Sequence, residues 1–74
     1  VGGTLPCVMN AANEVAVAHF LKDACGYLDI DGCVEHVMEA HEAEGVQKVE
    51  SLYQLAELDA WARSKAAQHL AARR

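Results

Sequence analysis

Two asparagines and a glutamate stand close together in a segment that is otherwise apolar: Asn10, Asn13 and Glu14. Asparagine is a poor interior helix residue because its amide competes for backbone hydrogen bonds, so two of them in one helix call for a reason. A ligand-binding patch is one explanation, and an exposed face without a role is another. The interpretation we favour is structural: these side chains dock against a neighbouring domain and fix its orientation.

Histidines and cysteines raise the question of a metal site. Cys33 and His36 are three residues apart and His41 follows five residues later, which does not match the paired ligands of a zinc site. His19 and His69 stand apart from this group. We therefore predict no metal ligand and place each histidine at a core edge or in solvent. The alternative, a small zinc protein, would require Cys33 and His36 to be ligands.

Asp59 lies within an apolar stripe and is a candidate for a carboxylate with a perturbed pKa. Arg63 follows four residues later, so we expect Asp59 to be satisfied by Arg63 or by a nearby helix N-terminus. The three cysteines, which include Cys7 and Cys25, are odd in number and contain no Cys-x-x-Cys pair. That pattern favours free thiols in a reducing compartment. Because no nucleophile–base pair or glycine-rich phosphate loop is visible, we predict no catalytic and no cofactor-binding residue here.

The elements that must position these residues are helices. The chain is rich in Ala and Leu, has a single proline near its start, and has few β-branched residues apart from Val, which indicates an all-α fold. Helices are expected at about residues 5–23, 30–44 and 52–72. Short connections predict antiparallel neighbours, so residues 1–74 form one domain, a three-helix up-down bundle.

Local signals set the expected ends of these helices. Thr4, Asp29 and Ser51 are predicted N-caps, and Ser51 with Gln54 has the spacing of a capping box. Gly26 follows the first helix and Gly45 the second, as glycine does after a helix C-terminus.

Each helix is expected to bury an apolar stripe, which periodicity assigns. The stripes are Leu5, Val8, Met9, Ala12, Val15 and Ala16; Ile30, Cys33, Val34, Val37, Met38 and His41; and Leu52, Leu55, Ala56, Ala62, Ala66 and Leu70, with Leu58 and Trp61 on a flank. In the first helix, Val17 and Leu21 point to the opposite side, the side of the asparagines. A helix that is apolar nearly all round is usually covered on more than one side, so we expect something outside this sequence to pack there.

Charge and hydropathy exclude two classes of partner. Six basic residues stand against eleven acidic ones, a net charge of -5, with no basic stripe, so nucleic-acid binding is not expected. No run of about 18 apolar residues could span a membrane, and no signal peptide is visible.

Three segments of the chain resemble the family of 1-deoxy-D-xylulose 5-phosphate reductoisomerases, in family order. They are Gly2-Gly3-Thr4 with Pro6, Asn10-Ala11-Ala12-Asn13-Glu14-Val15-Ala16-Val17-Ala18 and Phe20-Leu21; Gly26-Tyr27-Leu28-Asp29-Ile30; and Asp59-Ala60-Trp61-Ala62-Arg63. The family pattern in the first is close to Gly-Gly-Thr-x-Pro-x-x-x-Asn-Ala-Ala-Asn-Glu. The resemblance is to the C-terminal helical domain and covers nearly the whole chain.

The resemblance implies a parent enzyme with NADPH and a divalent metal, Mg²⁺ or Mn²⁺, that makes 2-C-methyl-D-erythritol 4-phosphate for the non-mevalonate isoprenoid pathway. It implies a location in the bacterial cytoplasm or in plastids. Because the family's metal, phosphate and cofactor sites lie in its other domains, no cofactor is expected in this fragment, which should be inactive alone. The family's bundle is four-helical, so one helix is expected before Val1.

The expected partner is therefore the rest of the parent enzyme, which this domain would buttress. By itself, the fragment should expose an apolar groove and associate, most simply as a two-fold dimer. The alternative is a free-standing helical module that binds a partner helix. A dinucleotide-binding strand–helix unit encoded upstream would favour the enzyme.

Overall fold

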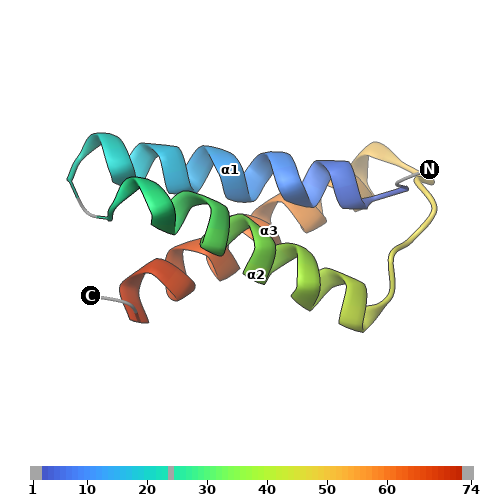
Figure 1. The fold of residues 1–74 in the computed structure, drawn as a ribbon. Helices are drawn as coiled ribbons and strands as arrows, with labels where there is room; N and C mark the ends of the chain where they lie inside the picture. Colours follow the sequence, from blue (N-terminus) through green and yellow to red (C-terminus); the bar gives the residue numbers. More distant parts are fainter. Residues whose placement is uncertain (1–2, 24, 73–74) are drawn as a thin grey trace.

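The computed structural model describes residues 3–23 and 25–72, and within them the chain forms three α-helices. Helix α1 spans Leu5–Leu21, α2 spans Tyr27–Glu44 and α3 spans Leu52–Ala72. Figure 1 shows α1 and α2 side by side and antiparallel, with α3 crossing behind both of them. The predicted all-α, three-helix up-down bundle is confirmed.

The start of α2 differs from the prediction. The helix begins at Tyr27, and Gly26, with extended backbone (φ -85°, ψ 165°), is its N-cap. Asp29 is the third helical residue, and its Oδ2 accepts a hydrogen bond from the Gly26 amide at 2.9 Å. An aspartate can satisfy a free amide from inside the first turn as well as from the cap, which is why the sequence placed this boundary three residues late.

Two further boundaries show how local chemistry ends a helix. Helix α1 stops at Leu21, before the predicted residue 23, and Asp23 takes a left-handed conformation (φ 59°). Helix α2 ends at Glu44, where Gly45 has φ 107°, as predicted from the glycine. At the start of α3, the backbone amide of Gln54 donates to Ser51 Oγ at 3.0 Å. The Gln54 side-chain oxygen accepts a hydrogen bond from the backbone amide of Glu50, and not from that of Ser51 as a capping box requires.

The core consists mainly of small side chains, which let the helix backbones approach closely. Its fully buried members are Val8, Ala11, Ala12 and Ala16 of α1, Cys33 and Val37 of α2, and Ala62, Ala66 and Leu70 of α3. The predicted stripe of α2 lies inward along its length. None of the described helices combines the length and apolar character that a membrane span requires.

Three residues predicted in the stripes are exposed. Leu52 is 85% exposed, Met9 is 44% exposed, and Ala56 is exposed as well. Periodicity identifies the inward face of a helix but not how far neighbouring helices extend along it. The predicted stripes therefore ran past the region that the three helices cover for one another.

Candidate functional site

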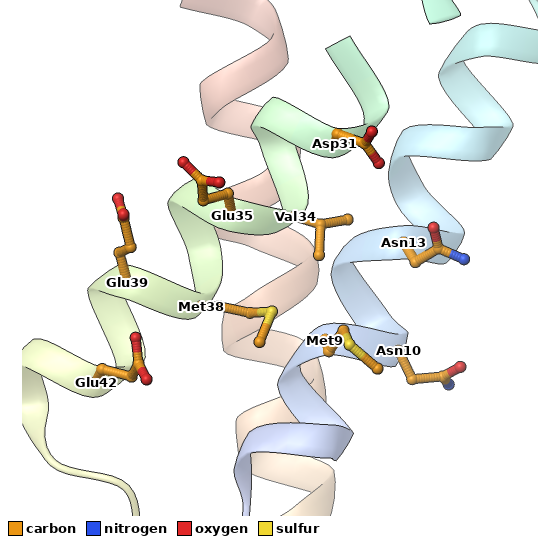
Figure 2. A pocket seen from close by; sticks show the side chains of 9 residues that line it. All are labelled: Met9, Asn10, Asn13, Asp31, Val34, Glu35, Met38, Glu39 and Glu42. Carbon is orange, nitrogen blue, oxygen red and sulfur yellow. The ribbon is translucent and has the colours of Figure 1, made fainter. Parts of the chain in front are cut away.

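An open groove of about 830 Å³ lies between α1 and α2. Its floor is apolar, with Met9 from α1 and Val34 and Met38 from α2. Figure 2 shows these side chains between the two helices, with α3 behind them, so the groove opens on the face that α3 does not cover. An apolar floor with polar walls is typical of a surface that packs against another polypeptide.

The α2 wall of the groove is acidic. Asp31, Glu35, Glu39 and Glu42 recur every three or four residues, so they share one side of the helix. The described residues that line the groove include no Lys or Arg. Glu42 also lies in the last turn of α2, where the helix dipole is negative. This wall therefore favours Lys, Arg or amide donors on whatever covers it.

The α1 wall carries two of the three side chains that the sequence singled out. Asn10 and Asn13 are exposed and lie at the outer rim of the groove, with the amide ends of their side chains directed away from α2 (Figure 2). Asn10 Nδ2 lies 3.4 Å from Glu14 Oε2. No described residue forms a hydrogen bond with the side-chain amide of Asn13, which leaves that group available to a partner.

Glu14, the third of these residues, forms an ion pair at the surface between α1 and α3. Its Oε1 lies 2.6 Å from Arg63 Nη2 of α3, and Arg63 Nε lies 2.8 Å from Asp59 Oδ2. Hydrogen bonds to Asp59 first, and to Glu14 second, raise the pKa of the Arg63 guanidinium above its ordinary value. The predicted Asp59–Arg63 pair thus exists, and Glu14 extends it into a link between α1 and α3.

A buried polar contact that the sequence did not predict lies at the other end of α1. Thr4 Oγ1 is 2.7 Å from His41 Nε2, and both side chains are almost fully buried. Thr4 Oγ1 also accepts the Gln47 amide at 3.0 Å, while the Thr4 amide donates to the Gln47 carbonyl at 2.9 Å. Thr4 is the N-cap of α1, as predicted, but its hydroxyl makes no cap hydrogen bond because tertiary partners use it. The sequence offered two signals, a histidine in the apolar stripe of α2 and the Gly-Gly-Thr segment before α1. It gave no local indication that the two segments are in contact.

The thiols also serve packing. Cys7, Cys25 and Cys33 lie 3.6–3.7 Å from the carbonyls of Leu55, Ala16 and Ala66, respectively.

Burial, and secondly Cys25, raises the pKa of the Cys33 thiol. The other predicted candidate for a zinc ligand, His36, stacks on His69, with the centroids of the two rings 4.4 Å apart. The described residues contain no group of three His, Cys, Asp or Glu side chains that could hold a metal ion.

Comparison with known proteins decides what kind of domain this is. The family described as DXP reductoisomerase C-terminal domain matches residues 1–65. The chain belongs to that family. It is 51% identical over 65 residues to 1-deoxy-D-xylulose 5-phosphate reductoisomerase of Chlorobium chlorochromatii, which is 88% of this chain and 16% of that protein.

Two other reductoisomerases show the same relation to this C-terminal domain. The protein of Leifsonia xyli subsp. xyli is 54% identical over 65 residues, 88% of this chain and 17% of the relative. The protein of a Synechococcus strain is 48% identical over 67 residues, 90% of this chain and 16% of the relative. The chain thus spans only 16–17% of the length of these relatives. No solved structure gave a significant match.

Proposed function

We propose that this domain is the non-catalytic C-terminal support of an NADPH-dependent 1-deoxy-D-xylulose 5-phosphate reductoisomerase, and that its α1–α2 groove packs against the rest of that enzyme. The observation that carries the proposal is the open groove, whose apolar floor and unpaired Asn13 amide suit a protein surface. The family match to a C-terminal domain supplies the partner, since the relatives are about six times longer than the matched segment.

The groups that could do chemistry support a structural role because they are engaged in holding helices together. Glu14 and Asp59 bind Arg63, His41 binds Thr4, and the Cys33 thiol faces a backbone carbonyl. A general base or nucleophile must instead reach a substrate. The groove's carboxylates are spread along α2 and form no cluster suited to a divalent cation. We propose, from the family resemblance, that NADPH and Mg²⁺ or Mn²⁺ bind in other parts of the parent enzyme, and that this enzyme is located in the bacterial cytoplasm or in plastids.

Asn13→Ala tests the docking role through two effects of opposite sign. In the isolated domain, Ala replaces a poor helix former whose amide has no described partner, so unfolding should cost about 0.5 kcal/mol more. In the full-length parent, the same change should remove a buried interdomain hydrogen bond and lower the free energy of unfolding by about 1 kcal/mol. Calorimetry on both forms, with enzyme kinetics on the parent, measures this.

Gln68→Ala on α3 is the matched control, since Gln68 is exposed and only reaches Ser64 at 3.4 Å. It should leave the parent's stability and kinetics unchanged. An Asn13→Ala parent with unaltered stability and unaltered kinetics would contradict the docking role.

Self-association of the isolated domain as a dimer remains part of the proposal, but the groove is not the surface for it. Two copies facing each other there would bring eight carboxylates together, four from each groove. Exposed apolar side chains gather instead near the two connections between helices: Phe20, Leu21, Tyr27 and Leu28 at one, and Val46, Val49, Leu52 and Tyr53 at the other. These ends are better suited to pairing between copies.

A further inference from the structure

The entry to α1 and the connection between α2 and α3 are joined by a compact set of contacts. Thr4 and Gln47 exchange two hydrogen bonds, of 2.9 Å and 3.0 Å, although they lie 43 residues apart. His41, in the last turn of α2, adds the 2.7 Å contact to the same hydroxyl. Figure 1 shows the connection running from the end of α2 past the start of α1. We call these residues, with Gly3, the clasp.

Gly3 shows that the clasp constrains the backbone as well as side chains. Its φ is 43°, a left-handed conformation that side chains rarely adopt. A Cβ placed there would overlap the Gln47 carbonyl oxygen, a backbone atom, so the connection would have to move away. Any residue but glycine would therefore open the contact.

The clasp is also costly. It buries a hydroxyl and an imidazole, and among the described residues His41 Nδ1 has no hydrogen-bond partner. Trp61 of α3 lies beside His41, and the centroids of the two rings are 5.9 Å apart. Strained or unsatisfied groups that persist point to a constraint beyond packing, because an apolar pair would fill the same space without this cost.

We propose that the clasp fixes the direction in which the polypeptide enters the bundle, so that the entry to α1 at Gly3 and Thr4 moves with the end of α2 as one rigid body. The reason is geometric: a helix N-terminus held by its own turn alone can pivot, whereas here the entry is tied to the end of α2 through Thr4 and His41. The claim that the clasp orients the preceding polypeptide of the parent enzyme rests on the proposed function. The claim that the clasp is rigid does not.

The test uses the full-length chain with Gly3→Ala, Thr4→Val and Thr4→Ser. Hydrogen exchange in peptides covering residues 45–51 measures how often the clasp opens. X-ray scattering measures how the bundle is placed relative to the rest of the enzyme. Thr4→Val and Gly3→Ala should speed exchange at the Gln47 amide about tenfold and enlarge the radius of gyration. Thr4→Ser keeps the hydroxyl and should leave both measurements as in the wild type.

Two outcomes would overturn the proposal. Faster exchange spread evenly over all three helices would show that the clasp only adds to global stability. Faster exchange at residues 45–51 with an unchanged radius of gyration would show that it does not orient the preceding chain. Asn13 lies outside the clasp, so the Asn13→Ala measurement reports failure of the docking role independently.

Discussion

Among single residues, Arg63 shows that an exposed charge network contributes little to stability even when its geometry is good. The guanidinium binds Asp59 on its own helix and Glu14 on α1, but its side chain remains 41% exposed. Solvent and salt screen such pairs, so the network sets the register of α1 against α3 more than it adds stability. An arginine is charged at neutral pH in any case. Because the folded pKa of Arg63 is raised, the contribution of its ion pairs is lost only as the pH rises to strongly alkaline values.

Cys33 makes a testable prediction about pH. Its thiol is fully buried, and burial raises its pKa above the ordinary value of 9.0. The folded state then holds the proton more tightly than the unfolded state, so the free energy of unfolding is unaffected below about pH 8 and falls as the pH rises past the ordinary thiol pKa. Urea midpoints at about pH 8 and about pH 10 should therefore differ.

Cys33→Ala isolates this effect from other groups that titrate at high pH. The variant should be less stable at about pH 8, because it loses the sulfur's packing, but its stability should fall less steeply toward about pH 10. Parallel declines in the wild type and in Cys33→Ala would show that the thiol proton plays no part.

Among the elements, glycines divide into those that the backbone requires and those that it merely tolerates. Gly45 has φ 107°, and a Cβ added to it would meet no atom within 4 Å, so only its conformation demands glycine. Gly32 lies in the interior of α2 with a helical backbone and open space around it. Identical substitutions should therefore act in opposite directions at the two positions.

Gly32→Ala should raise the free energy of unfolding by about 0.5–1 kcal/mol, because alanine loses less backbone entropy in a helix. Gly45→Ala should lower it by about 1–2 kcal/mol, because an L residue is strained at positive φ. Chemical denaturation of both variants beside the wild type checks this pair. The same sign of change at both positions would contradict the helix end assigned to Gly45.

The helices themselves could be predicted from the sequence because their signals are local. Composition, the apolar stripe of α2 and the glycine at 45 determined the fold class and most boundaries, and the end points predicted for the third helix, 52 and 72, coincide with α3. The clasp could not be predicted, since Thr4, His41 and Gln47 meet only after α2 has folded back on α1. For the same reason, the sequence grouped Glu14 with Asn10 and Asn13, although its strongest partner, Arg63, lies 49 residues away.

In the molecule as a whole, the bundle has one covered side and one open side. Helix α3 covers one side of the α1–α2 pair, and the groove with its acidic wall lies on the other (Figures 1 and 2). Val17, expected on an outward face, is half-buried, whereas Leu21 is 75% exposed near the end of α1. The open side therefore follows the groove between the helices and not the whole back of α1.

Whether the rest of the parent enzyme covers this groove can be measured by hydroxyl-radical footprinting of the groove's two methionines, Met9 and Met38. Met9 is 44% exposed in the domain and its sulfur is readily oxidised. If the groove is covered, oxidation of Met9 should be at least about tenfold slower in the full-length enzyme than in the isolated domain, with equal rates once both are unfolded. Equal rates in the two folded proteins would show an open groove and contradict the proposed docking.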